Sequence, residues 1–470
     1  MGHELKDKCG VFGIYGHKDA ARLAYLGLYA LQHRGQESAG IAVSDRKKVI
    51  CERGMGLVSD VFTERNIRSL KGDIAIGHVR YSTTGSSVIE NSQPFLVKYS
   101  QGFVAVAHNG NLVNSCGLRD ALEQDGSIFQ SSMDSEIIVH LIANEKGSFE
   151  ERLIAALKKL KGAFSLTLLT EDKMIAVRDP HGFRPLCIGK VDGAYVAVSE
   201  TCALDLIGAK YVRDVDPGEI VIIDEKGLRS IKPLPNVRPA QCIFELIYFA
   251  RPDSNIYGAS VYDARKELGR QLAREHPVKA DLILPVPDSG TFAALGFAEE
   301  SKIQFEMGIV RNHYVGRTFI QPSQKNRDLA VKIKLNPVNK LIENKRIVLV
   351  EDSIVRGTTS KVRIRALREA GAKEIHMRVS CPPLISPCFF GIDFPTTREL
   401  IASGRTVENI RKFIGLDSLG YLSLDGMLSA VPINKNTFCT ACFTKNYPMT
   451  VENGQGKLCL EKKILRNSGS

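Results

Sequence analysis

The chain has 470 residues, which at ~150 residues per domain suggests about three average domains or two large ones. Its 44% hydrophobic and 24% charged residues are typical of a globular protein and exclude a disordered, collagen-like or coiled-coil chain. The net charge is +11, but Lys and Arg are spread along the chain, which indicates a solvated surface, or attraction of an anionic small substrate, rather than nucleic-acid binding.

The N-terminal residues 1–8 are short and charged, unlike a secretory signal, and no segment approaches the ~20 apolar residues that span a bilayer. We therefore expect a cytoplasmic protein with no membrane partner. In a reducing compartment, eleven irregularly spaced cysteines are not a disulfide framework, so some are expected to be catalytic or bound to metal.

Residues 9–230 alternate short β runs with few helices. Helices are predicted over 19–31 and 134–144, where apolar residues recur at helical spacing. Strands are predicted at 11–15, 74–77, 103–106, 165–169 and 196–198. This pattern favours an α+β layered domain over repeated βαβ units.

The segment 224–241 holds three prolines among basic residues, which predicts a linker or crossing strap. From about residue 260 the pattern becomes strand, loop and helix, with apolar strands at 282–286, 347–350 and 374–380. Such runs predict an α/β domain with a parallel sheet buried on both faces. Residues 381–470 are interpreted as irregular.

Several first-half residues fit the hydrolysis of an amide. Cys9 opens the folded part, although a single early cysteine is more often a small buried hydrophobe. Arg80 suits an amino acid's α-carboxylate, Asp134 suits its α-ammonium, and Asn109 with the Gly110 N–H suits an oxyanion. If Cys9 becomes the N-terminus, its own amine, with a pKa of ~8, can act as the base. His33, His78 and His108 are interpreted as hydrogen-bonding residues.

The segment 346–372 fits a phosphate site. An apolar strand delivers Glu351 and Asp352 to its carboxyl end, where ligands bind in open α/β sheets. A loop then enters a helix, whose N-terminus binds phosphate. Two carboxylates beside a phosphate would repel it unless they hold sugar hydroxyls or Mg²⁺. The alternative is a solvated acidic strand end before a Thr-capped helix.

The first-half segments, with residues 32–40, resemble the N-terminal-nucleophile glutamine amidotransferases. That resemblance implies a four-layer αββα fold and a propeptide, residues 1–8, removed to expose Cys9. It also implies that Thr83 joins Arg80 and Asp134 in binding glutamine.

Segment 351–359 resembles the 5-phosphoribosyl 1-pyrophosphate (PRPP) signature of type I phosphoribosyltransferases, which usually carry Asp where this chain has Glu351. The resemblance implies that loop 286–290 holds pyrophosphate and that 311–320 is a mobile lid. It assigns Mg²⁺ to Ser289, Glu351 and Asp352. The implied PRPP-binding residues are Asp352, Ser353, Arg356, Gly357, Thr358 and Thr359.

The cysteines outside the amide site include one CxxC pair, Cys439 and Cys442, which would need two more thiolates to bind metal. Candidates for these are Cys242, Cys381, Cys388 and Cys459. Resemblance to one branch of the glutamine PRPP amidotransferases implies a [4Fe–4S] cluster on Cys242, Cys388, Cys439 and Cys442. The remaining cysteines interpreted as buried thiols are Cys51, Cys116, Cys187 and Cys202.

Over residues 9–445 the motifs follow the order found in the glutamine PRPP amidotransferases. The resemblance implies that glutamine, PRPP and water give 5-phosphoribosylamine, pyrophosphate and glutamate, the first committed step of purine synthesis. It also implies one Mg²⁺ and one cluster per subunit, feedback inhibition by purine nucleotides, and a homotetramer. The expected layout is a propeptide (1–8), a glutaminase domain (9–230), a linker and strap (231–259), a phosphoribosyltransferase domain (260–430) and a tail (431–470).

Two alternatives remain. Glucosamine-6-phosphate synthase shares the first half, but residues 351–359 argue against its sugar-isomerase domains. A PRPP-sensing purine repressor that binds DNA would share the PRPP loop and the basic charge, but it would lack Cys9, Arg80 and Asp134.

Overall fold

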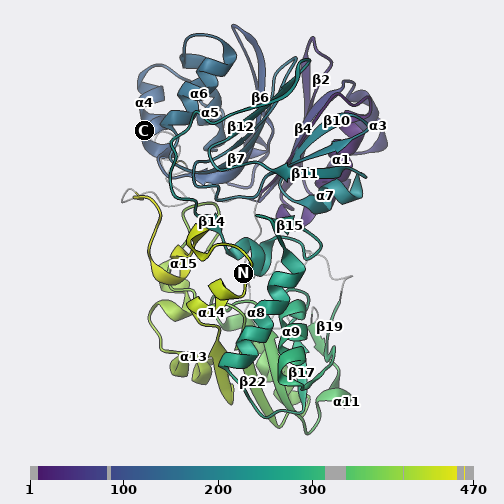
Figure 1. The fold of residues 1–470 in the computed structure, drawn as a ribbon, viewed down its shortest axis with the longest axis vertical. Helices are drawn as coiled ribbons and strands as arrows, with labels where there is room; N and C mark the ends of the chain where they lie inside the picture. Colours follow the sequence, from purple (N-terminus) through teal and green to yellow (C-terminus); the bar gives the residue numbers. More distant parts are fainter. Residues whose placement is uncertain (1–8, 82–85, 313–334, 395, 452–459, 461–470) are drawn as a thin grey trace.

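The computed structural model describes residues 9–81, 86–312, 335–394, 396–451 and 460. Figure 1 shows two halves stacked along the long axis, the first built around two antiparallel sheets and the second around a parallel sheet. None of the described helices is long and apolar enough to span a bilayer.

The first half contains two antiparallel sheets packed face to face. One sheet has the order β11-β9-β10-β1-β4-β2-β3 and the other β13-β12-β8-β7-β6-β5. The strands of the first are β1 (Gly10–Tyr15), β2 (Ser38–Ser44), β3 (Val49–Met55), β4 (Ile74–Arg80), β9 (Cys187–Val191), β10 (Ala194–Val198) and β11 (Lys210–Asp214). Those of the second are β5 (Phe95–Tyr99), β6 (Gly102–Leu112), β7 (Gly162–Leu169), β8 (Met174–Arg178), β12 (Ile220–Asp224) and β13 (Gly227–Ile231).

Apolar side chains from both sheets form the core between them, for example Val11 and Ile76 from one and Ala105 and Val221 from the other. Further cores lie under helices on the outer face of each sheet. The helices are α1 (Ala20–Ala30), η1 (Gln32–Arg34), α2 (Val58–Val61), α3 (Glu64–Ser69), η2 (Ile89–Asn91), α4 (Ser115–Gln124), α5 (Ser135–Asn144), α6 (Phe149–Lys159) and α7 (Thr201–Leu206). The arrangement confirms the predicted four-layer αββα fold.

The second half is an α/β domain whose parallel sheet has the order β18-β17-β21-β22-β23. Its central run, residues 347–350, is fully buried, as expected for a strand covered on both faces. The strands are β17 (Leu282–Pro285), β18 (Gln304–Phe305), β21 (Arg346–Glu351), β22 (Glu374–Val379) and β23 (Ser418–Tyr421), beside an antiparallel pair of β19 (Ile309–Arg311) and β20 (Leu335–Pro337). The helices are α8 (Val261–Glu275), α9 (Thr291–Ser301), α11 (Asn339–Ile342), α12 (Thr358–Glu369), η4 (Thr397–Glu399), η5 (Ile401–Ser403), α13 (Val407–Ile414), α14 (Leu424–Ser429), η6 (Lys435–Thr437) and α15 (Ala441–Thr444).

Short elements join the halves. Strand β14 (Gln241–Cys242) pairs in parallel with β24 (Phe438–Cys439), so the strap meets the C-terminal tail where the halves adjoin (Figure 1). The strap continues through the π-helical turn η3 (Glu245–Phe249) and the β15 (Asn255–Ile256) and β16 (Ala259–Ser260) hairpin.

Two expectations about chain organisation were wrong. The predicted linker 224–241 begins too early, because β13 pairs with β12 inside the first-half sheet. The stretch 381–470, interpreted as irregular, contributes the edge strand β23 and the helices α13 and α14. These elements are only four to eight residues long, too short for their sequence pattern to predict them by itself.

Candidate active site

The Cys9 thiol is buried at the start of β1, near the charged groups predicted around it. Its Sγ donates to the Tyr81 carbonyl at 3.4 Å. Burial raises the pKa of this thiol to about 11, which Arg80 opposes and Asp134 and Glu37 reinforce. The structure therefore brings Cys9, Arg80 and Asp134 into one electrostatic environment, in which the thiol stays protonated at neutral pH.

The predicted oxyanion residues lie within β6, which packs against β1 and β4 of the opposite sheet. The strand runs through Leu112 rather than ending before Asn109. The Asn109 side chain is buried and its Nδ2 has no hydrogen-bond partner in the structure. This amide N–H can therefore donate to an oxyanion of a bound substrate. Gly110 is required sterically, since an added Cβ would lie 2.0 Å from the Ala163 carbonyl oxygen.

The predicted glutamine-binding residues are buried ionic groups. Arg80 lies 3.9 Å from Glu37 and donates to the Ser86 carbonyl at 3.1 Å. Asp134 accepts from the Leu112 N–H at 2.9 Å. Thr83 lies outside the described residues.

The three histidines of the motifs all have polar partners. His33 Nε2 is 2.8 Å from Glu200, and His78 Nε2 is 3.0 Å from the His108 carbonyl oxygen. Burial lowers the pKa of His78 to about 3, so it is neutral. His108 lies 3.5 Å from Asp134; burial opposes its charged form, but the carboxylate raises its pKa overall. These contacts agree with hydrogen-bonding roles.

At the carboxyl end of β21, Asp352 is the buried acidic group of the second site. Burial raises the pKa of Asp352 to about 6, and the neighbouring Glu351 charge adds to the rise. The Ser289 and Ser353 hydroxyls hydrogen-bond to it, the latter at 2.5 Å. Ser289 from the loop after β17 thus meets Asp352 from the loop after β21, as two predicted magnesium ligands should.

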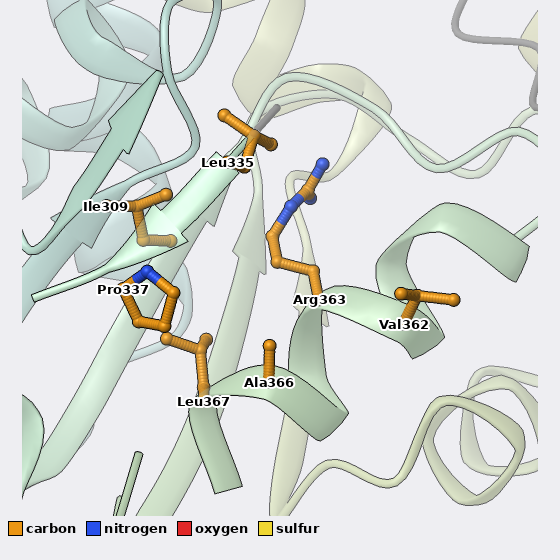
Figure 2. A pocket seen from close by; sticks show the side chains of 7 residues that line it. All are labelled: Ile309, Leu335, Pro337, Val362, Arg363, Ala366 and Leu367. Atoms are coloured by element: carbon orange, nitrogen blue, oxygen red, sulfur yellow. The ribbon is translucent and has the colours of Figure 1, made fainter. Parts of the chain in front are cut away.

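Glu351 is held differently. Its Oε1 accepts from Arg363 Nη1 at 2.7 Å, and its Oε2 lies 3.4 Å from the Ser360 hydroxyl. Figure 2 shows Arg363 projecting from α12, where its stem and apolar side chains of α12 face those of the paired strands β19 and β20. Both carboxylate oxygens of Glu351 therefore contact residues of α12, and its predicted role as a magnesium ligand stays a prediction.

The loop between β21 and α12 has the geometry of an anion-binding turn. Gly357 lies in the left-handed region at φ +73° and caps α12, whose first residues are Thr358 and Thr359. Arg356 donates to Glu399 at 2.5 Å. The predicted lid residues 313–320 lie outside the described residues.

Two arginines near the sites were missed by the sequence analysis. Arg265 on α8 is buried, acts electrostatically on Asp352, and donates to the Leu246 and Ala250 carbonyls. Arg34 donates from Nε to the Cys9 carbonyl at 3.1 Å. Arg34 belongs to the segment 32–40 that carries the resemblance, but the sequence indicates neither arginine's partner, because each acts on residues that are remote in sequence.

The four predicted cluster cysteines gather where the strap, the 381–391 segment and the tail meet. Cys242 and Cys439 are register partners; Cys242 and Cys388 act electrostatically on Cys439, and all three act on Cys442. All four are free thiols. Burial raises the pKa of each thiol, while Arg184 acts in the opposite direction on Cys242 and Cys388.

Within the described part of the chain, no three His, Cys, Asp or Glu side chains are arranged to hold a single metal ion. An iron–sulfur cluster differs, because each of its irons takes one cysteine and sulfide lies between them, so the ligands stand farther apart. A donor set of four thiols beside a buried guanidinium fits such an anionic group.

One cysteine interpretation was wrong: Cys116 is disulfide-bonded, not a thiol. Cys51, Cys187 and Cys202 are free, and burial raises the pKa of each thiol, which agrees with inert roles.

Comparisons with known proteins cover nearly the whole chain. A family model for the glutamine amidotransferase domain matches residues 78–205. The chain is 53% identical to Arabidopsis thaliana amidophosphoribosyltransferase 2, chloroplastic, over 94% of this chain and 80% of that protein. It is 52% identical to Methanocaldococcus jannaschii amidophosphoribosyltransferase, over 94% and 98% respectively. The solved B. subtilis glutamine PRPP amidotransferase with ADP and GMP superposes with a TM-score of 0.91 at 48% identity, covering 95% of this chain and 98% of that one.

Proposed function

The chain belongs to the amidophosphoribosyltransferase family, and we propose that its two sites act in sequence on glutamine and PRPP. Ammonia released from glutamine at Cys9 replaces the pyrophosphate on C1 of PRPP, giving 5-phosphoribosylamine, pyrophosphate and glutamate in purine biosynthesis. The observation that carries this is the pairing, in one chain, of a buried cysteine beside Arg80 and Asp134 with a PRPP-type loop at Asp352.

At the first site, Arg80 and Asp134 bind the α-carboxylate and α-ammonium of glutamine. The Cys9 thiol attacks the amide carbon and must give up its proton, which its raised pKa makes unfavourable without a base. Removal of residues 1–8 would leave the Cys9 amine as that base. Asn109 Nδ2 and the Gly110 N–H hold the oxyanion, ammonia departs, and water hydrolyses the thioester.

At the second site, the helix N-terminus at Thr358 and Thr359 binds the 5-phosphate, with Ser353, Arg356 and Gly357 completing the loop. Asp352 and Ser289 would hold Mg²⁺, which supplies charge neutralisation for the departing pyrophosphate. Ammonia attacks C1 of the ribose in its neutral form, so water must be excluded between the two sites.

The four cysteines, we infer, hold a [4Fe–4S] cluster that ties the tail to the strap and the 381–391 segment. Anaerobically purified protein should contain close to four irons and four sulfides per chain. Cys388→Ala should lose the iron, whereas Cys381→Ala, which removes a buried thiol outside the set, should keep it. Zinc in place of iron would contradict the cluster.

The remaining assignments concern regulation, assembly and location. Purine-nucleotide inhibition is proposed because the B. subtilis relative was solved with ADP and GMP. The homotetramer is proposed from family membership alone. A reducing cytoplasm is proposed from the nine free cysteines among the described residues, although Cys116 is disulfide-bonded and the plant relatives are named as chloroplastic.

Stoichiometry tests the function directly. Purified protein given glutamine, PRPP and Mg²⁺ should release glutamate and pyrophosphate in equal amounts. Edman sequencing of the same preparation should read Cys-Gly-Val-Phe. Glutamate release without pyrophosphate would contradict the function, and full glutamine use by a chain that still begins with Met1 would contradict the proposed base.

A further inference from the structure

One short segment of the second half lies directly on the oxyanion strand of the first. We call residues 388–391 the docking loop; it follows β22 in the chain and begins at the cluster residue Cys388. Asn111 on β6 donates from Nδ2 to the Phe389 carbonyl at 2.8 Å. The two residues are 278 positions apart, so this contact joins the halves.

The backbone of the docking loop also touches Gly110 itself. An added Cβ at Gly391 would lie 2.9 Å from the Gly110 carbonyl carbon and 3.0 Å from its oxygen. Phe390 stacks on Phe183 of the first half with ring centroids 4.3 Å apart. The loop therefore packs tightly against the residue whose N–H is assigned to the oxyanion.

Buried charged side chains hold the docking loop in place through hydrogen bonds to its backbone and to each other. Arg184 donates to the Phe390 carbonyl and, at 3.2 Å, to Glu245 of the strap. Glu245 also accepts from Arg34 at 2.9 and 3.1 Å, and Arg34 donates to the Cys9 carbonyl. Both arginines and Glu245 are fully buried, so the linkage is shielded from solvent and costly to rearrange.

We propose that the docking loop is a positioning element for glutamine hydrolysis, in which Gly391 and Asn111 fix the Gly110 N–H toward the oxyanion. The inference rests on the proposed function, because the oxyanion forms only if Cys9 attacks an amide. It makes the glutaminase half dependent on a segment of the PRPP half. Neither residue touches substrate, so each acts through β6.

Gly391→Ala tests this, with Gly415→Ala as the matched control. Both glycines belong to the second half and have left-handed backbones, at φ +94° and +90°, but a Cβ at Gly415 meets nothing within 4 Å. Gly391→Ala should lower kcat for glutamine about tenfold or more, because loss of one whole oxyanion donor costs ~10²–10³. The KM for glutamine and the ammonia-dependent rate should change less than about twofold.

Asn111→Asp gives an independent variant if Gly391→Ala folds poorly. It keeps the side-chain shape but places a carboxylate against the Phe389 carbonyl, and it should also lower kcat with glutamine alone. Asn114→Asp is its control, since Asn114 donates to the Lys159 carbonyl at 2.9 Å within the first half.

Several results would overturn the proposal. They are an equal loss with glutamine and ammonia, an effect on KM alone, or glutamine turnover that survives both Gly391→Ala and Asn111→Asp in folded protein. These differ from failure of the proposed function, in which wild-type protein itself would not couple glutamine to pyrophosphate release.

Discussion

The two sites are assembled in contrasting ways. At the second site most groups come from one continuous segment, residues 351–359, with Ser289 added from a neighbouring loop. At the first site, Cys9 precedes β1, Arg80 ends β4 and Asn109 lies in β6 of the other sheet, while Asp134 precedes helix α5. A continuous loop can keep its geometry through local backbone structure, whereas the first site depends on packing across the whole domain and on the docking loop.

Their electrostatics also differ. Burial raises the pKa of both key acids, to about 11 for Cys9 and about 6 for Asp352, but the consequences are unlike. A protonated thiol needs a base before it can react. A buried carboxyl with a pKa near 6 is largely ionised at neutral pH. Its buried charge is unfavourable, and a bound cation can offset it.

Cys9→Ala should separate the activities of the two sites most clearly. Without its nucleophile the chain should lose glutamine-dependent synthesis by at least about a thousandfold. Ammonia-dependent synthesis should stay within about twofold, because the second site is intact. The measurement is pyrophosphate release with either nitrogen source, and a parallel loss of both would break the division between the sites.

Asp352→Asn should have the opposite pattern. It removes the proposed magnesium ligand, so pyrophosphate release should fall about a hundredfold with glutamine and with ammonia alike. Asp281→Asn is the control, because Asp281 precedes β17 at the amino end of the parallel strands, opposite Asp352, and pairs with Arg346 at 2.7 Å. An Asp352→Asn variant that kept its ammonia-dependent rate would remove this residue from the chemistry.

The Glu351–Arg363 pair should affect stability more than chemistry. Both side chains are at least nine-tenths buried, so Arg363→Met leaves a lone buried carboxylate and should lower the free energy of unfolding by about 3 kcal/mol. Adding Glu351→Gln should restore much of that loss. Thermal and urea unfolding of the single and double variants measures the coupling.

The same variants test the metal assignment of Glu351. If Arg363 holds this carboxylate away from Mg²⁺, Glu351→Gln should shift the half-saturating Mg²⁺ concentration less than Asp352→Asn does. An equal shift would instead make Glu351 a ligand.

Sequence patterns predicted the elements whose signals are long and local. The apolar run before Glu351 predicted β21, and the spacing of apolar residues predicted α1 and α5. They failed for α13 and β23, which are short and take their stability from packing in the second-half core. The predicted strand 103–106 also ended too early, because β6 continues to Leu112 and both Asn109 and Gly110 pair with β7.

For the sites, motifs predicted residue types but not what supports them. Nothing near Arg34, Arg265 or Gly391 indicates a partner, since each acts on a residue at least 25 positions away. The Glu351 contact was unpredictable for another reason: the choice between a metal and Arg363 depends on side-chain geometry one turn into α12.

The smallest expected effect concerns pH and distinguishes the sites by their titration. The folded pKa of Asp352, about 6, lies above its ordinary value of 3.8, so its contribution to stability is complete below about pH 4 and is lost as pH rises through 6. By pH 8 this amounts to about 3 kcal/mol relative to Asp352→Asn in protein without PRPP. The Cys9 thiol, with a pKa near 11, should contribute nothing between pH 5 and 8.

Urea unfolding at pH 5 and pH 8, compared between wild type and Asp352→Asn, should show a difference of about 1.4 kcal/mol, because about half of the loss has already occurred by pH 5. Asp179 in the first half also has a pKa raised to about 6 by burial, but it is present in both proteins and cancels. Cys9→Ala should leave the pH dependence unchanged over this range, because its thiol is protonated throughout. If instead Asp352→Asn had the same pH dependence as wild type, the buried carboxyl would be solvated or paired in the free protein, and the electrostatic contrast between the two sites would fail.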